Sequence, residues 1–359
     1  MMRKPFRSTI AALLSCLIWF GCSKDVSPET RSFYMGFEFS SHPPSDIAGP
    51  VYARLEAESD IISHRFDNGV PWIEALNGAP FPEAVTNDWT LRRNRTNASQ
   101  KIYLSATPLN SARNALAALP AAWSTYTYDH ADVKAAYLNY CSRLIGFFHP
   151  HYFNMAIEAN LVYVNDPQKW SDYLRLHAYV YQQLKAMYPE VVIFTSVEGG
   201  HLLEGFVTGN DHVQQRLAVM ELMEYSDLYA VSFYPYRNVY PGNLYPDGTL
   251  DRLFSISHKP LAVAETGYTA KPFVAHTGAG VLASYPDPFR QQKYTRDLLK
   301  ACQQYRAVFV INEAPRVNDM IQYSFNPPSN HPGLNDKKGN TRPALMTWRE
   351  FLSKKHQAQ

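Results

Sequence analysis

The sequence predicts an α/β fold with one (β/α)8 catalytic domain, the TIM barrel. Two observations support this prediction. Short apolar stretches typical of buried strands alternate with amphipathic helical stretches from Arg31 onward. Acidic, aromatic and amide residues also follow strand after strand, as they do at the carboxyl rim of such barrels, where active sites lie.

The alternation gives eight strands with helices between them. The expected strands cover residues 33–39, 60–66, 101–106, 152–157, 191–196, 227–233, 260–264 and 307–311. The expected helices cover residues 51–58, 131–148, 167–187, 211–225, 288–305 and 343–354. Eight units in roughly 325 residues match the count and length of a barrel with long loops.

A doubly wound sheet is the main alternative fold. It would need a phosphate-binding loop after its first strand, and Gly36-Phe-Glu-Phe-Ser-Ser is not one. The loose match Gly278-Ala-Gly-Val-Leu-Ala283 does not directly follow a strand and is weak evidence. No linker or repeat divides residues 32–357, so we expect a single domain.

The composition gives information about which ligands the protein could bind. A net charge of +2 and the absence of long basic runs give no argument for nucleic acid. Aromatic residues make up 14% of the chain, which suits a cleft that stacks on sugar rings and suits a large aromatic core equally well. We expect no cofactor, and we expect a monomer.

The N-terminus predicts secretion and lipid attachment. Arg3, Lys4 and Arg7 precede an apolar stretch at residues 10–20, which indicates a signal peptide over residues 1–21. The Gly-Cys22 pair resembles a bacterial lipobox and implies lipidation of Cys22, although an ordinary signal peptide is an alternative. Residues 22–31 would then be a tether, and Ser23 favours the outer membrane of a bacterial envelope, on its periplasmic or surface face.

Cysteine and histidine give little sign of metal or redox chemistry. Cys141 and Cys302 lie in helical patterns far apart in sequence and are expected to be buried free thiols. The pair His149-Pro-His151 could bind a metal, but it falls at the amino end of the fourth strand, the face that serves stability. No Gly-x-Ser-x-Gly elbow is present, which disfavours a serine hydrolase.

Two strand ends carry the strongest catalytic signal. Glu158 follows the fourth strand, and Glu265 follows the apolar seventh strand. Buried carboxylates need partners, so acids at these positions indicate a role other than core packing. A retaining glycosidase uses two carboxylates roughly 5 Å apart, one as nucleophile and one as acid/base. The other candidates for substrate binding at the rim are Arg65, His64, Trp72, Asn160, Glu198, Tyr234, Tyr236, Tyr268, Asn312 and Glu313.

Several of these residues lie in segments that are similar to a known protein family. The chain resembles the clan of retaining (β/α)8 glycoside hydrolases. Val-Ser-Phe-Tyr-Pro-Tyr236 and Val-Ala-Glu-Thr-Gly-Tyr268 are most similar to the arabinogalactan endo-β-1,4-galactanase family, glycoside hydrolase family 53. The closing segment from Gly333 to Trp348 resembles the last turn of such barrels. The resemblance implies hydrolysis of O-glycosyl bonds in a β-linked polysaccharide or oligosaccharide, with Glu265 as nucleophile and Glu158 as acid/base. It places Tyr234 and either Arg65 or His64 beside the nucleophile.

The sequence also departs from the pattern. The clan has Asn directly before the acid/base, where this chain has Ile157, and Asn160 is displaced by three positions. Asn312 and Glu313 stand where the family often has a tryptophan. A non-catalytic glycan-binding lipoprotein is therefore an alternative. A barrel hydrolase of another bond, using Glu198 or Glu313, is a third.

Overall fold

The computed structural model describes residues 29–39, 53, 56–237, 245–270, 287–313, 334 and 340–357, and the backbone of 273–277 and 280–284. The signal peptide, Cys22, most of the tether, most of the helix expected at 51–58 and much of the closing segment lie outside these residues.

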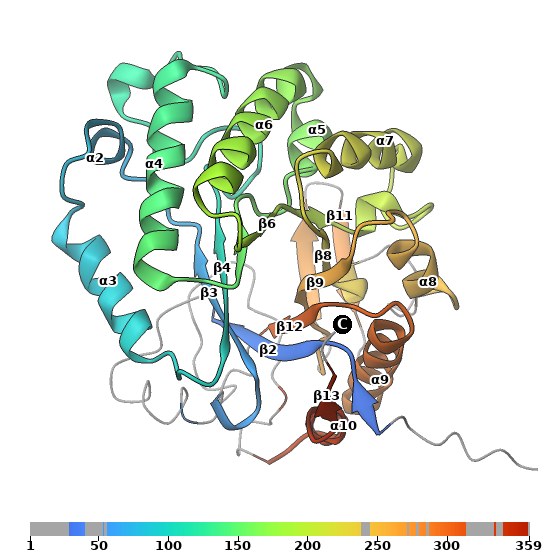
Figure 1. Cartoon of the computed structure of the whole chain (residues 1–359). Helices are drawn as coiled ribbons and strands as arrows, with labels where there is room; N and C mark the ends of the chain where they lie inside the picture. Colours follow the sequence, from blue (N-terminus) through green and yellow to red (C-terminus); the bar gives the residue numbers. More distant parts are fainter. Residues whose placement is uncertain are drawn as a thin grey trace, which may run out of the picture.

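The chain folds as a single-domain (β/α)8 barrel. Its strands are β2 (Tyr34–Phe39), β3 (Ile61–Phe66), β4 (Lys101–Ala106), β5 (Tyr152–Asn154), β6 (Val192–Phe194), β7 (Ser196–Glu198), β8 (Tyr229–Phe233), β9 (Leu261–Thr266) and β12 (Phe309–Glu313). All neighbouring strands of this sheet are parallel, in the order β6-β5-β4-β3-β2-β12-β9-β8-β7. The first and last strands, β2 and β12, are therefore neighbours, as a closed barrel requires (Figure 1).

The fifth predicted strand is divided in two. β6 and β7 form the two ends of the sheet, and only Thr195 separates them. The Thr195 hydroxyl donates a hydrogen bond to the carbonyl of Ala156, and the Ser196 amide donates to the same carbonyl. These bonds hold the segment after β5 next to Thr195. The barrel therefore closes through a short irregular stretch rather than through continuous pairing of two strands.

Helices surround the sheet (Figure 1). They are α2 (Trp72–Asn77), α3 (Glu83–Asn94), α4 (Ala131–Phe148), α5 (Leu161–Asn165), α6 (Trp170–Met187), α7 (His212–Met223), α8 (Thr249–Phe254), α9 (Pro288–Gln304) and α10 (Pro343–Leu352). The predicted helix at 131–148 is confirmed in full. Asp211 and Asp287 cap α7 and α9 by accepting two backbone N–H bonds each, which explains why these helices start where they do.

The remaining strands are short. β10 (Phe273–Thr277) and β11 (Gly280–Ser284) are paired antiparallel, and residues 280–283 of the loose nucleotide-binding match lie in β11. β1 (Thr30–Arg31) pairs with β13 (Lys355–His356), so the two ends of the described chain are joined. Arg31 is buried and forms an ion pair with Asp60. The folded unit thus includes Thr30 and Arg31, which the sequence had assigned to the tether.

The core has two layers. Inside the barrel, the ring of Tyr103 on β4 lies 5.1 Å from that of Phe309 on β12 and 5.9 Å from that of Phe194 on β6. These three strands are not neighbours, so the rings meet across the barrel axis. A larger apolar layer lies between the sheet and the helices and includes Val231 and Val263. Gly36 is needed where β2 and β3 approach, because a Cβ there would lie 2.1 Å from the carbonyl oxygen of Ile61.

Cys141 and Cys302 are buried free thiols, as predicted. Burial raises the pKa of both, which keeps them protonated and unreactive. Of the helices in the described ranges, none has the combination of length and hydrophobicity needed to cross a membrane.

Candidate active site

Glu265 is directed into the barrel by an irregularity in β9. The register between β8 and β9 pairs Val231 with Val263, and then Ser232 with Glu265, so Ala264 is an extra residue on β9. Such a β-bulge changes the direction of the side chains that follow it. Ala264 belongs to the apolar layer inside the barrel, and Glu265, which follows it, also lies inside, with 4% of its surface exposed.

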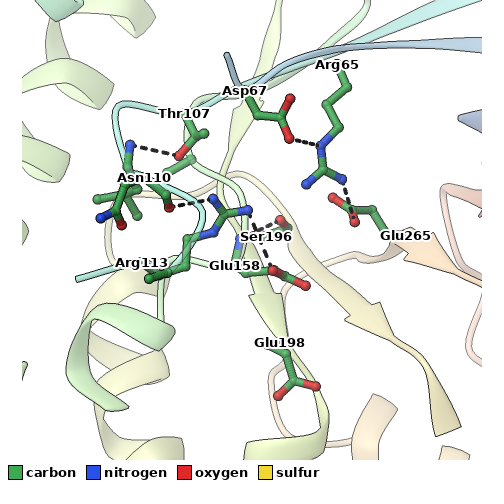
Figure 2. A network of polar contacts seen from close by, with 12 residues as sticks. Arg65, Asp67, Thr107, Asn110, Arg113, Glu158, Ser196, Glu198 and Glu265 are labelled. Atoms are coloured by element: carbon green, nitrogen blue, oxygen red, sulfur yellow. Dashed lines mark hydrogen bonds and ion pairs between the residues drawn. The ribbon is translucent and has the colours of Figure 1, made fainter. Parts of the chain in front are cut away.

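Arg65 is the centre of the charge network around Glu265 (Figure 2). Its Nη1 lies 2.8 Å from Oε2 of Glu265, and its Nε lies 2.7 Å from Oδ2 of Asp67. Burial alone would lower the pKa of Arg65, but the charges of Glu265, Glu38 and Asp67 raise it well above its ordinary value. A permanently charged guanidinium thus lies directly against the buried carboxylate of Glu265.

Glu38 is a third buried carboxyl group in this network. Nη1 of Arg65 donates to Oε1 of Glu38 at 2.9 Å, so Glu38 and Glu265 share one guanidinium nitrogen. Burial and then the charge of Glu265 raise the pKa of Glu38 to about 8. Near neutral pH Glu38 is therefore a neutral acid, and Arg65 faces two carboxylates rather than three.

Tyr234 also contacts Glu265. Its hydroxyl donates to Oε2 of Glu265 at 3.3 Å, a long hydrogen bond. The other carboxylate oxygen, Oε1, has no hydrogen-bond partner among the described residues. One oxygen of Glu265 is thus held by Arg65 and Tyr234, and the other is uncommitted.

Glu158 lies in a tight turn between β5 and α5. Its φ is +53°, a left-handed conformation that costs a non-glycine residue energy and that occurs often at functional sites. The backbone amide of Glu158 donates to Oγ of Ser196 at 3.1 Å, which holds the turn against β7. The strand predicted at 152–157 ends early, at Asn154, because the Asn154 side chain accepts the Ala156 and Ser196 amides in place of strand pairing.

The carboxylate of Glu158 has a weaker counter-charge than that of Glu265. The cation paired with it among the described residues is Arg113, whose Nη2 lies 3.7 Å from Oε2 of Glu158. Burial and then the charge of Glu265 raise the pKa of Glu158 to about 7. Glu158 is thus an acid with a raised pKa and only a distant cation, whereas the neighbouring Glu265 contacts a guanidinium directly.

Three of the predicted substrate contacts are committed to the protein interior. His64 points toward the helices, where its ring packs on Phe148 and its Nε2 contacts Oγ1 of Thr96 at 2.8 Å. Burial lowers the pKa of His64 to about 3, so it is neutral. Neighbouring residues on a strand face opposite sides, which is why Arg65, and not His64, reaches Glu265.

Trp72 and Asn160 are the other two. Trp72 is 2% exposed and donates from Nε1 to the carbonyl of Ala117, so it packs under the loop and offers no face to a sugar. Asn160 is fully buried and exchanges two hydrogen bonds with the backbone of Glu198, at 3.1 and 2.7 Å. The clan has an asparagine at the position of Ile157, and the buried amide of Asn160 does not take its place. Ile157 itself is also buried.

Glu198 holds its own turn together. Its two carboxylate oxygens accept the amides of Gly200 and His201 at 2.9 Å, and Oε2 lies 2.6 Å from Nδ1 of His201. This makes Glu198 a structural carboxylate with one neighbouring imidazole. Its charge still acts on Glu158, where it contributes to the raised pKa.

The remaining predicted residues lie at the strand ends near Glu265. Tyr236 and Tyr268 are buried, and their rings meet edge to face at 6.1 Å, as do those of Tyr234 and Tyr236. Asn312 is buried, and its Oδ1 lacks a hydrogen-bond partner in the described part of the chain. Glu313 is aligned with Glu38 in the β2–β12 register, and its charge raises the pKa of Glu38 further.

Sequence reasoning did not select Glu38, Asp67 or Arg113 as site residues. Glu38 lies in the last two residues of a predicted strand and Asp67 directly follows one, so their positions at strand ends were a usable signal. Arg113 lies in the loop after β4 and carries no comparable signal, because only the fold of that loop brings it to Glu158.

Among the described residues, no group of three or more histidine, cysteine, aspartate or glutamate side chains is arranged to hold a metal ion. His149 ends α4 in a left-handed conformation, and His151 accepts the amide of Ile102 through Nδ1. Both residues thus have structural contacts at the predicted amino-terminal face.

No protein-family model matches the chain, and no curated protein does. Solved structures do match. The chain is similar to one of two fungal β-1,4-galactanases, with a TM-score of 0.60 and 15% identity over 88% of this chain and 98% of that chain. It is similar to native xylanase 10B from Thermotoga maritima, with a TM-score of 0.56 and 13% identity over 90% and 95% of the two chains.

A third neighbour is an exo-β-1,4-mannosidase from Opitutaceae bacterium strain TAV5, with a TM-score of 0.62 and 12% identity over 89% of this chain and 59% of that chain. At such identities the likeness establishes the fold. The chain thus shares its (β/α)8 barrel fold with glycoside hydrolases of several substrate classes.

Proposed function

We propose that this chain is a retaining glycoside hydrolase that cleaves a β-linked polysaccharide or oligosaccharide, with Glu265 as the nucleophile and Glu158 as the acid/base. The observation that carries the proposal is the unequal treatment of the two carboxylates. Arg65 lies 2.8 Å from Glu265, whereas burial and the charge of Glu265 raise the pKa of Glu158 to about 7.

The chemistry follows in two steps. A carboxylate oxygen of Glu265 attacks the anomeric carbon, the bond to the leaving oxygen breaks, and Glu158 donates its proton to that oxygen. Glu158, now ionised, then takes a proton from water, whose oxygen attacks the anomeric carbon and releases Glu265. No cofactor is required, and Glu158 recovers its proton in the second step.

The finer assignments rest on the same site. We propose β-1,4-galactan as the first substrate to test, because the Tyr234-Pro-Tyr236 and Glu265-Thr-Gly-Tyr268 segments that resemble the galactanase family lie together around Glu265. We propose that Arg65 and Tyr234 position the nucleophile and that Tyr236, Tyr268, Asn312 and Glu313 shape the sugar site beside it. His64, Trp72 and Asn160 are not retained as substrate contacts.

Lipid attachment at Cys22 and an outer-membrane location remain part of the proposal. Because Thr30 already pairs with Lys355, the tether between the lipid and the folded domain would be residues 23–29. So short a tether would keep the domain close to the membrane surface.

A second candidate function is glycan binding without catalysis. The observation that favours it is the burial of both Ile157 and Asn160, which leaves no asparagine side chain of this segment beside Glu158 to bind a sugar 2-hydroxyl. This candidate predicts glycan affinity with no product that depends on Glu158 and Glu265.

The test is product release by the secreted form, residues 23–359, on β-galactan, β-mannan, β-glucan and xylan. Glu265→Gln is measured in parallel, with the exposed loop variant Glu190→Gln as the matched control. Turnover by the wild type and the control, absent in Glu265→Gln, supports the hydrolase. Full activity in Glu265→Gln would refute the assignment, and affinity without turnover would favour the binding protein.

A further inference from the structure

We propose that a polar cavity between α5 and α7 is a binding site for a sugar residue on the leaving-group side of the substrate. This inference rests on the proposed glycosidase function. The cavity has a volume of about 360 Å³, within the range of small-molecule sites. It is lined by residues that include Tyr163, His201, Thr208, Asn210, Gln214 and Gln215.

The cavity lies on the catalytic side of the barrel. Tyr163 belongs to α5, which follows β5, and His201 and Thr208 belong to the connection between β7 and α7. In a (β/α)8 barrel these connections form the carboxyl rim, where substrates bind.

The cavity wall is joined to the segment that carries Glu158. Asn160, two residues after Glu158, exchanges two hydrogen bonds with the backbone of Glu198. Glu198 in turn holds His201, and the carbonyl of His201 accepts a hydrogen bond from Asn210 at 2.7 Å. The cavity is thus built onto the turn of the proton donor.

The direction also fits the leaving group. Glu158 gives its proton to the leaving oxygen, so the sugar residues beyond that oxygen extend past Glu158 and away from Glu265. In the view of Figure 2, Glu198 lies on the other side of Glu158 from Glu265. His201, which Glu198 holds, lines the cavity.

His201 is oriented as a hydrogen-bond acceptor. The carboxylate of Glu198, 2.6 Å from Nδ1, requires a proton on that nitrogen, so in the neutral ring Nε2 is an acceptor. Nε2 has no hydrogen-bond partner within the described residues. A sugar hydroxyl is a suitable donor to it.

Gln215 gives a second, independent sign of a ligand. It lines the cavity with only 4% of its surface exposed, and its Oε1 has no hydrogen-bond partner among the described side chains and backbone groups. Buried polar groups are almost always hydrogen-bonded, so this oxygen is a group of the cavity wall that the described protein leaves unsatisfied.

The lining selects for a neutral, hydroxyl-rich ligand. The described lining has no lysine or arginine to attract an anion. Asp211 is already occupied, because its carboxylate caps α7 by accepting the amides of Val213 and Gln214. The remaining groups are amides, a hydroxyl, an imidazole and the ring of Tyr163, which together match the hydroxyls and the apolar face of a sugar.

The test fills the cavity. Gln214→Trp places a large ring in the lining, and Leu217→Trp, on the same helix and 52% exposed outside the lining, is the matched control. Each variant is compared with the wild type on β-1,4-linked tetrasaccharides of galactose, mannose, glucose and xylose and on the nitrophenyl glycoside of the same sugar. Melting temperatures establish that each variant is folded.

We expect the ratio of kcat/KM on the tetrasaccharide to kcat/KM on the nitrophenyl glycoside to fall roughly tenfold in Gln214→Trp, the loss typical of one disrupted binding contact. Leu217→Trp should keep the wild-type ratio. An unchanged ratio in folded Gln214→Trp, or an equal fall in Leu217→Trp, would overturn the inference.

A separate measurement distinguishes failure of this site from failure of the proposed function. Calorimetric binding of the same tetrasaccharides is measured with the Glu265→Gln protein, alone and combined with each tryptophan variant. If no variant and no wild type shows turnover, the hydrolase proposal fails, while binding weakened by Gln214→Trp alone still supports the cavity. Tetrasaccharide affinity that Gln214→Trp leaves unchanged, or no affinity for any tetrasaccharide, would contradict it.

Discussion

Glu265 and Glu158 both lie at the carboxyl rim of the barrel, but Glu265 is buried, whereas the side chain of Glu158 is 17% exposed, and the two carboxylates have different cationic partners. Glu265 shares Nη1 of Arg65 with Glu38, whereas the cation paired with Glu158 among the described residues is Arg113 at 3.7 Å. The same negative charge on Glu265 that Arg65 compensates raises the pKa of Glu158. The closer cationic partner of Glu265 is thus the difference on which the proposed nucleophile and the proposed proton donor rest.

The largest effect is expected from Glu265→Gln. An amide cannot form the glycosyl-enzyme bond, so kcat should fall by at least about 10³-fold, the scale on which loss of a nucleophile acts. Steady-state hydrolysis of the substrate identified in the panel is the measurement. A loss of kcat of less than tenfold would show that Glu265 is not the nucleophile.

Glu158→Gln tests the proposed acid/base. Loss of a general acid costs roughly 10²–10⁴-fold on a sugar leaving group, and much less in the first step on a dinitrophenyl glycoside, which needs no proton. Because Glu158 must be protonated and its pKa is about 7, wild-type kcat/KM should decline as pH rises above about 7. The variant should lose that alkaline limb. Equal losses on both leaving groups would contradict the acid/base role.

The two arginines sharpen the contrast. Arg65→Lys keeps a charge but cannot bond Glu38, Asp67 and Glu265 at once, and kcat should fall about 10–100-fold. Arg113→Lys, the matched change beside Glu158, should cost only a few-fold, because its contact is long. The measurement is the steady-state kcat of both variants. Equal losses of kcat would show that Arg65 and Arg113 contribute equally to the site.

Glu38→Gln tests the shared guanidinium through stability. Burial raises the pKa of Glu38 in the folded protein to about 8, so between about pH 4.5 and 8 the native state holds a proton that the unfolded chain releases. Stability from this group is therefore lost as pH rises through that window. Urea unfolding should show Glu38→Gln gaining on the wild type by on the order of 2 kcal/mol from pH 5 to pH 8. Parallel pH profiles for the two proteins would exclude the buried acid.

Tyr234→Phe should have the smallest effect. Its hydroxyl lies 3.3 Å from Oε2 of Glu265, and Arg65 remains on the same oxygen, so we expect kcat to fall by only about 2–10-fold. Steady-state kinetics and the acid limb of the pH profile provide the measurement. A loss as large as that of Arg65→Lys would mean that the hydroxyl, and not the guanidinium, holds the nucleophile.

Much of the fold could be predicted from the sequence. Buried parallel strands are short and apolar, and helices between them have a repeating apolar face, so both leave a local pattern. The strand at Lys101–Ala106 and the helix at Ala131–Phe148 agree with their predicted bounds. The strand predicted at 152–157 does not, because the side chain of Asn154 ends it through contacts with β7, which are distant in sequence.

The site could be predicted only in part. The positions of Glu158 and Glu265 after apolar strands indicated a function, because an acid there does not contribute to the hydrophobic core. The same reasoning chose Trp72 and Asn160, which are polar or aromatic for reasons of packing. A strand-end position states that a residue is near the rim, and it does not state whether the side chain faces the substrate or the protein.

The sequence by itself determined the order of the barrel strands and the two acids that follow the fourth and seventh predicted strands, because periodicity and strand length are local properties of the chain. Only the tertiary structure decided which charges meet. Arg65 reaches Glu265 across the barrel, and the bulge at Ala264 accompanies the inward position of Glu265. Burial and distance set the protonation of Glu38 and Glu158, and both arise only when strands far apart in sequence close into one barrel.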